Sequence, residues 1–422
     1  MSKHTRAKTK TLSPKPLAAL IPMLVFAAPI GAVETGHVAA GSGTINTQGA
    51  TTTINQQSDR MIVNWNNFDI RAGEMVQFNQ PSTSSAVLNR VNSANPTQIG
   101  GALNANGRVF VVNPNGVVVG KTGSIRANGV VLSTLDVANN TFMAMTPSSN
   151  GYAYANFHST GATSGAVVNE GVISSGAGGV SLFGAQVING AAGSIYAKGV
   201  QTALGNGVAA INLVAADSVD VIANGSSGSY IVNQTGAGSA TLTSIANDGV
   251  IRNDYGLVNM TVESGSNASL RNTGLIEAHG SSRENGGISL RNKSTGGSSS
   301  TSVGGSLDGE SVIVYANNNT TIDGLIKGGT ISAEVSGANS NATLLIADNA
   351  QLSVEDRPSN WNPSFLQLIG DKVVVNGQVS SSGTAEVRSY NSDGVSIRKD
   401  GLNAPTWTIN DGGTITTGKG SY

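Results

Sequence analysis

Side chains that could carry out catalysis are few and scattered in this 422-residue sequence. It contains no cysteine, which excludes thiolate catalysis, disulfides and Cys-ligated metal sites. Beyond one histidine near the start, only His37, His158 and His279 remain, far apart and without the spacing of a metal site. The carboxylates of Asp217 and Asp220 could serve a polysaccharide hydrolase or lyase, although turn or surface carboxylates are the simpler interpretation. We predict no catalytic residue, metal or cofactor, and keep a polysaccharide-degrading enzyme as the alternative.

The elements that position these residues are predicted to be strands. Gly supplies 55 residues and Asn 43, while charged residues make up only 12%. Residues that favour turns and strands are thus abundant and helix formers are scarce, which predicts an all-β chain with many turns. The net charge of −1 offers no general attraction to nucleic acid, so we expect none as a partner.

The N-terminus has the pattern of a secretory signal peptide. Five basic residues lie within the first 15 positions, and an apolar run from Leu17 to Val33 follows. A membrane anchor is the alternative, but Pro22 and Pro29 interrupt the run, which is short for the roughly 20 residues of a membrane span. We predict a signal peptide over residues 1–32 and export of the rest.

Short apolar segments recur between Gly and Asn turns. Asn169-Glu170-Gly171-Val172-Ile173 returns at Asn247 to Ile251 and at Asn272 to Ile276, with later echoes around Gly324 and Gly377. The separations of these glycines, 78, 25, 50 and 53 residues, are near multiples of 25 or 26. Such a period without helices predicts a solenoid of the parallel β-helix type. In that fold the Asn amides can form a hydrogen-bonded ladder, and the Ser- and Gly-rich residues 281–307 are expected to bulge from the coils.

Residues 53–136 carry the most specific motifs. They are Val63 to Phe68 (VNWNNF), Met75 to Pro81 (MVQFNQP), Ser85 to Val91 (SAVLNRV), Leu103 to Gly107 (LNANG), Asn113 to Gly116 (NPNG) and Ser133 to Asp136 (STLD). This order of motifs resembles the amino-terminal secretion domain of two-partner secretion exoproteins, the filamentous haemagglutinin and high-molecular-weight adhesin family.

The resemblance implies export through the periplasm and recognition by an outer-membrane transporter of the TpsB type with POTRA domains. It also implies a right-handed parallel β-helix with an N-terminal capping region, and a product that is secreted or displayed on the bacterial surface as an adhesin or haemagglutinin. A host-cell or cell-surface receptor would be a further partner. The expected organisation is a signal peptide over 1–32, a secretion domain over 33–160 and a β-helix extension over 161–422.

Six residues are the candidates for transporter recognition: Asn89, Arg90, Asn113, Pro114, Asn115 and Gly116. Read from the residues alone, Asn113 to Gly116 predicts a tight turn between two apolar strands, because Pro114 fixes φ and Asn-Gly favours a turn. The resemblance to the family implies that the same four residues are a secretion determinant. They can be both a structural turn and a secretion determinant. Arg90 is either a docking charge or a solvated or turn-bound arginine. Trp65 and Phe68 are expected to close the first coil.

Overall fold

A computed structural model describes residues 33, 36–145, 153–161, 165–199, 209–223, 230–236, 242–265, 267–280, 286–294, 298–336, 342–356, 364–390, 395–397, 402–403, 406–410 and 416–417. The chain divides at residue 31 into two units, and the fold below is that of the second unit, residues 32–422. The predicted signal peptide over 1–32 lies outside the described residues. Within the described residues, no helix is long and apolar enough to cross a membrane.

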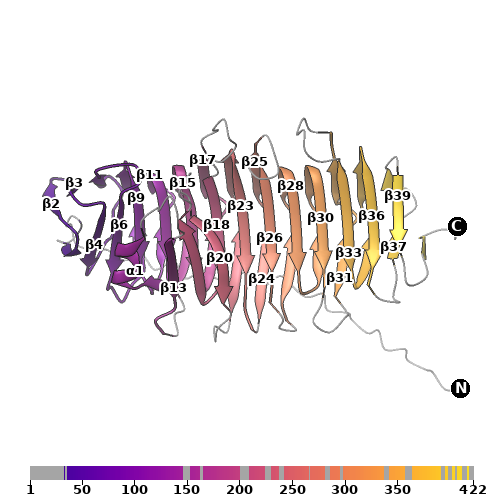
Figure 1. Cartoon of the computed structure of the whole chain (residues 1–422), viewed down its shortest axis with the longest axis horizontal. Helices are drawn as coiled ribbons and strands as arrows, with labels where there is room; N and C mark the ends of the chain where they lie inside the picture. The colour runs from indigo at the N-terminus through magenta and orange to yellow at the C-terminus, as the bar shows by residue number, and fades with distance from the viewer. Residues whose placement is uncertain are drawn as a thin grey trace, which may run out of the picture. The chain divides into compact units, whose positions relative to one another are not determined.

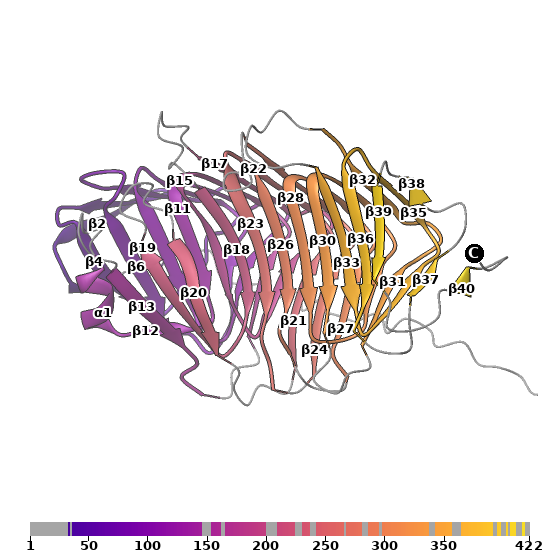
Figure 2. The ribbon, with the colours of Figure 1, turned by 45° about the vertical axis from the view of Figure 1, so that its right-hand side comes forward.

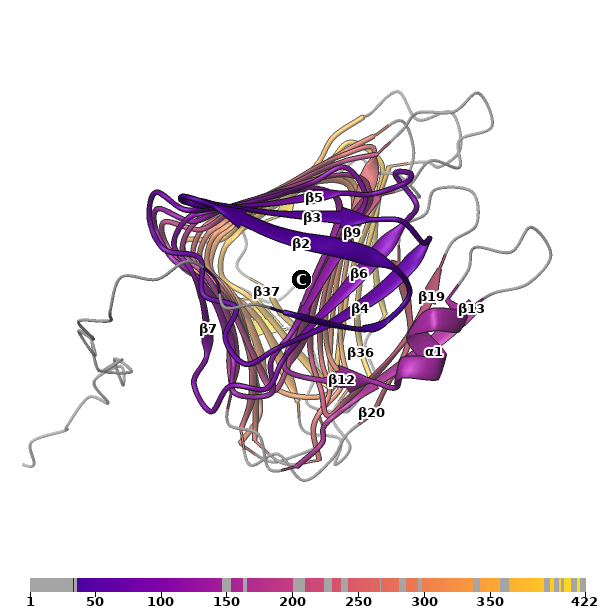
Figure 3. The same ribbon diagram turned by 90° about the vertical axis from the view of Figure 1, so that its left-hand side faces the viewer.

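The second unit is a stack of β-coils, as Figure 1 and the turned view of Figure 2 show. Viewed along the stack, each coil has three sides, here called face 1, face 2 and face 3 (Figure 3). Strands on each side pair in parallel with those of the neighbouring coils.

Face 1 is a 12-stranded sheet. Its strands are β7 (Thr97–Ile99), β10 (Val117–Val119), β14 (Ala166–Asn169), β16 (Gln186–Asn189), β21 (Thr243–Asn247), β24 (Ala268–Asn272), β27 (Ser300–Val303), β29 (Thr320–Ile322), β31 (Thr343–Ile346), β34 (Lys372–Val375), β37 (Val395–Ile397) and β40 (Thr416–Thr417).

Faces 2 and 3 belong to one 24-stranded sheet, because four long strands bend from one face to the other. These are β11 (Ser124–Ser133), β15 (Val172–Gly184), β28 (Ser306–Ala316) and β30 (Leu325–Val335). The rest of face 2 comprises β3 (Thr51–Gln56), β5 (Met75–Asn79), β8 (Ala102–Ala105), β17 (Ser194–Lys198), β22 (Val250–Asp254), β25 (Leu275–His279), β32 (Gln351–Val354), β35 (Gln378–Ser381) and β38 (Leu402–Asn403). The rest of face 3 comprises β4 (Arg60–Trp65), β6 (Ala86–Val91), β9 (Arg108–Val112), β18 (Ala209–Ala215), β23 (Gly256–Val262), β26 (Gly287–Asn292), β33 (Phe365–Gly370), β36 (Thr384–Ser389) and β39 (Thr406–Asn410).

Two antiparallel strands close the N-terminal end of the stack. β1 (His37–Ala40) pairs with β4, and β2 (Gly43–Gln48) pairs with β3. Trp65 and Phe68 are fully buried in the interior of the first coil, with ring centroids 4.8 Å apart. The predicted all-β parallel β-helix with an N-terminal cap is therefore confirmed, and backbone pairing by β1 and β2 is what covers the open strand edges.

The period near 25 residues expected from the sequence holds approximately for most coils and fails clearly at one. Between successive register partners from Val172 to Gln378, the coils are 22, 56, 25, 31, 19, 26 and 27 residues long. The 78 residues from Gly171 to Gly249 thus make two coils, because one of them carries an insertion. The expected bulge over 281–307 is wrong for its described part, where β26, β27 and the start of β28 are coil strands.

The corner between face 1 and face 2 contains the predicted asparagine ladder. The side-chain Nδ2 of Asn169 donates to Oδ1 of Asn189 at 2.8 Å, Asn189 donates to Asn247 at 2.7 Å, and Asn247 donates to Asn272 at 2.7 Å. All four amides are fully buried. Three side-chain hydrogen bonds therefore link four successive coils through these amides, which confirms this prediction.

A second layer covers part of the outer side of face 3. It consists of α1 (Asn139–Ala144) and an antiparallel sheet of β12 (Asp136–Val137), β13 (Ala153–His158), β19 (Ser218–Ala223) and β20 (Tyr230–Gly236). Phe110 of β9 packs edge-on against Phe142 of α1, with centroids 5.1 Å apart, and Phe157 of β13 packs against Phe183 of β15 at 5.4 Å. The unit therefore has two apolar cores, one inside the coils and one between face 3 and this outer layer.

Candidate transporter-recognition site

Asn113 to Gly116 form the corner turn between face 3 and face 1, at the end of β9 and the start of β10. The backbone N–H of Gly116 donates to the carbonyl of Asn113 at 2.9 Å, and the Oδ1 of Asn113 accepts from the N–H of Asn115 at 2.9 Å. Pro114 is half-buried between them. These contacts form the tight turn that the sequence predicts.

The side chain of Asn113 joins this turn to the preceding coil. It is fully buried, and its Nδ2 donates to the carbonyl of Asn95 and to the hydroxyl of Thr97, each at 3.0 Å. Its backbone N–H donates to the carbonyl of Ser133, in the following coil, at 3.0 Å. Asn113 therefore connects three successive coils at one corner.

Asn115 and Gly116 have different surroundings. Asn115 is exposed, and its Nδ2 donates to the carbonyl of Ser93 at 2.8 Å. Gly116 has a φ of +123°, and a Cβ added there would lie 3.0 Å from the carbonyl oxygen of Ala166. The turn thus needs glycine for backbone reasons, while Asn115 is the member that presents its side chain to solvent.

Asn89 lies in the interior of the coils. It is fully buried on β6, its Nδ2 donates to the carbonyl of Phe110 at 3.1 Å, and its Oδ1 accepts from the indole Nε1 of Trp65 at 3.0 Å. Its polar atoms are thus paired with groups of the two neighbouring coils, β4 and β9.

Arg90 points outward from β6, beneath the outer layer. Its Nε donates to both carboxylate oxygens of Asp136, at 3.0 and 3.1 Å. Its other nitrogens donate to the side chain of Asn139 at 2.5 Å and to the carbonyl of Val137 at 2.6 Å. The Arg90 side chain is 15% exposed, so it attaches the start of α1 to face 3 rather than standing free in solvent.

The six predicted residues lie close together on two neighbouring coils. β6 and β9 pair so that Asn89 lies beside Val111 and Arg90 beside Val112, immediately before the corner turn. Arg60 was not among the predicted residues, yet its Nε donates to the carbonyl of Met145 at 2.9 Å at the other end of α1. The continuous apolar stretches of β4 and β9 were the available sign that a second layer covers these strands. Strands buried on both sides lack the alternation of apolar and polar residues that half-exposed strands show.

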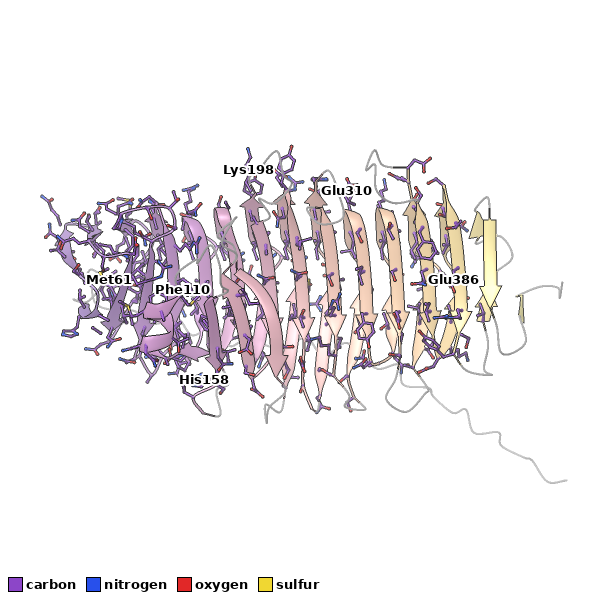
Figure 4. All side chains as sticks on the ribbon, viewed as in Figure 1. Met61, Phe110, His158, Lys198, Glu310 and Glu386 are labelled. Carbon is purple, nitrogen blue, oxygen red and sulfur yellow. The ribbon has the colours of Figure 1, made fainter. Side chains whose placement is uncertain are left out.

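The candidate catalytic carboxylates lie apart from this region. Asp217 and Asp220 belong to the start of the outer layer around β19, and Asp220 accepts a hydrogen bond from the Asn156 amide of β13. Figure 4 shows the side chains along the stack, with Phe110 and His158 labelled near this layer. Over the described residues, no group of three His, Asp or Glu side chains is close enough to hold a metal ion.

Comparison with known proteins supplies three similarities. The family model of the TPS secretion domain matches residues 31–308. A heme/hemopexin-binding protein of Haemophilus influenzae is 37% identical over 100 residues, which is 24% of this chain and 11% of that protein. The crystal structure of the HMW1 secretion domain from Haemophilus influenzae matches 90% of this chain and all of its own with a TM-score of 0.69 at 23% identity, a likeness of fold.

The family model covers well over half of the chain, and it includes the cap, the corner turn, Arg90 and the outer layer. The aligned part of the heme/hemopexin-binding protein is about a tenth of its length. The chain belongs to the TPS secretion domain family of two-partner secretion exoproteins.

Proposed function

We propose that this chain is an exoprotein carried across the outer membrane by a cognate TpsB-type transporter with POTRA domains. Its N-terminal coils serve as the export signal and as the first folded part of the β-helix. The observation that supports this most is the corner turn from Asn113 to Gly116, which connects three coils yet leaves Asn115 exposed within the family's domain.

The proposed organisation is a signal peptide over 1–32, a secretion domain over 33–160 and a β-helix extension over 161–422. Coil stacking continues across residue 160, since β11 pairs with β15, so the extension would fold on the secretion domain as a template.

Recognition is proposed to involve Asn89, Arg90 and Asn113 to Gly116. Asn89 and Asn113 are fully buried in the folded chain. A transporter would therefore contact these two side chains before the coils close, whereas Asn115 is accessible before and after folding.

The exported product is proposed to be secreted or displayed on the cell surface as an adhesin or haemagglutinin with a cell-surface receptor. The relatives named for heme and hemopexin match over 11% or less of their length, so that likeness supports a shared export domain and not a shared ligand. The alternative, a polysaccharide-degrading enzyme, has less support because Asp220 is engaged with Asn156 in the outer layer.

Deleting the cognate outer-membrane transporter of the producing strain tests the proposal. Cell fractionation should then find the chain in the periplasm, while the parent strain carries it on the surface or in the medium. Undiminished surface export in the deletion strain would overturn the proposed function.

A further inference from the structure

Three outward-facing apolar side chains and two arginines form a continuous surface on face 3 of the first coils. Ile62, Leu88 and Phe110 are register partners on β4, β6 and β9, and each has an exposed fraction of 1% or less. Arg60 and Arg90 lie on the same strands β4 and β6. We call these five residues the first-coil surface.

Residues 136–145, here called the latch segment, contact both ends and the centre of this surface, and Phe157 of β13 also stacks on Phe110 with centroids 6.3 Å apart. Arg90 holds the start of the latch segment through Asp136, Val137 and Asn139. Arg60, which is 5% exposed, holds the end of the latch segment through the carbonyl of Met145. A cation at this place also stabilises the C-terminus of the helix.

The apolar part of the latch segment fits the same surface. Phe142 is fully buried and meets the Phe110 ring edge-on at 82°. The latch segment thus offers the surface a carboxylate, backbone carbonyls and one aromatic ring.

The latch segment follows β4, β6 and β9 in the chain, so these strands can form before the latch segment docks on them. The contacts of Arg90 with the latch segment span 46 to 49 residues, and those of Arg60 span 85. Before the latch segment docks, the first-coil surface exposes two cations and a patch of apolar side chains, which is an unstable state for a folded sheet.

We propose that the first-coil surface is where the incompletely folded chain engages its transporter, and that docking of the latch segment ends the engagement. This inference rests on the proposed function. It adds that the latch segment and the transporter compete for the first-coil surface. By complementarity, the transporter segment presents what the latch segment presents: a carboxylate or carbonyl oxygen for Arg90 and an aromatic or aliphatic side chain for Phe110.

Opening the latch segment in the full mature chain tests the inference. Asp136→Ala combined with Phe142→Ser removes the carboxylate and the ring while keeping both arginines. If the open state of the native chain is about 10% populated or less, binding to the purified periplasmic domains of the transporter should tighten about tenfold or more. Adding Arg90→Gln to the opened variant should abolish that gain.

Arg252→Gln is the matched control. Arg252 forms an ion pair with Glu277 on face 2, with Nε and Oε2 2.5 Å apart, away from the first-coil surface, so its loss should leave binding unchanged. Circular dichroism should show that every variant keeps its β-structure, and the milder pair Asp136→Asn with Asn139→Ala replaces the opened variant if that one unfolds.

An opened variant that folds but binds no more tightly than the native chain would overturn the inference, as would a gain that survives Arg90→Gln. If export proceeds without the transporter, the proposed function itself is overturned and this inference with it. If export needs the transporter and opening has no effect, only the inference fails.

Discussion

At the scale of residues, buried amides set how one coil meets the next. Each amide of the asparagine ladder has its neighbours in adjacent coils, so its hydrogen bonds exist only when the coils are in register. The same column holds Val119 before the ladder and Val303 after it, which shows that the position also accepts an aliphatic side chain. The ladder therefore contributes register as well as stability.

Asn247→Val should lower the free energy of unfolding by about 1–3 kcal/mol, because it leaves Asn189 and Asn272 without their ladder partner while filling similar space. Replacing all four ladder asparagines by Val should cost less than four times that amount, since no side-chain amide of the ladder is then left unpaired. Denaturant titration measures the free energy of unfolding of the single and the fourfold variant. A fourfold variant that loses four times as much as Asn247→Val would contradict the ladder account.

Asp248 makes the folding stability at the same corner depend on pH. Partial burial opposes ionisation, but hydrogen bonds from Arg271 and Thr273 outweigh it and lower the pKa of the Asp248 carboxyl. A lowered folded-state pKa means that the stabilisation is present above the ordinary Asp value of about 3.9 and is lost as the pH falls through the folded value.

Asp248→Asn should therefore reduce stability slightly at neutral pH, by at most about 1 kcal/mol for this partly exposed pair. Below about pH 4 the variant and the parent should converge. Thermal unfolding across pH 2–7 measures this, with high salt as the control that weakens the pair. A difference that grows toward low pH would have the wrong sign.

At the scale of elements, the sequence predicted strands, corner turns and the ladder because each depends on residues adjacent in the chain. It did not predict the outer layer or the partner of Arg90, because Asp136 lies 46 residues away and is brought near only by coil stacking. The regular period failed at one coil for a related reason: an insertion between β17 and β22 lengthens that coil to 56 residues without disturbing its register.

Glycine at the corner after face 1 is required by the close approach of coils. A Cβ added to Gly274 would lie 2.1 Å from the carbonyl oxygen of Gly249, whereas one added to Gly161 has no atom within 4 Å. Gly274→Ala should therefore destabilise the chain by about 1–3 kcal/mol or more, and Gly161→Ala should change little. Hydrogen exchange should show lost protection in β22 and β25 for the first variant only; equal effects would contradict this packing.

At the scale of the whole molecule, stability is a sum over neighbouring coils. Truncation after Gly324 removes the coils that begin at β30, β32, β35 and β38 and leaves the earlier coils with their own contacts. Small-angle scattering should find the remaining coils folded and the stack shorter by about 19 Å, at about 4.8 Å a coil. Complete unfolding, or collapse to a compact globule, would contradict the solenoid account.

Export of the whole chain is the property that the corner turn at Asn115 is proposed to control. A suitable control lies at the same corner of a later coil. Asn319 is exposed like Asn115 and lies between face 3 and face 1, and its side-chain Oδ1 accepts a hydrogen bond from the backbone N–H of Thr343 at 2.8 Å. Asn318, by contrast, is buried and would confuse folding with recognition.

The most direct measurement of the central claim is the secreted fraction of Asn115→Ile compared with that of Asn319→Ile, with circular dichroism of both purified chains. The account predicts severalfold lower secretion for Asn115→Ile alone, with the β-sheet signal of the two variants equal. Equal secretion of the two variants, or a loss of β-structure that accounts for the defect, would contradict the proposal that the transporter recognises this turn.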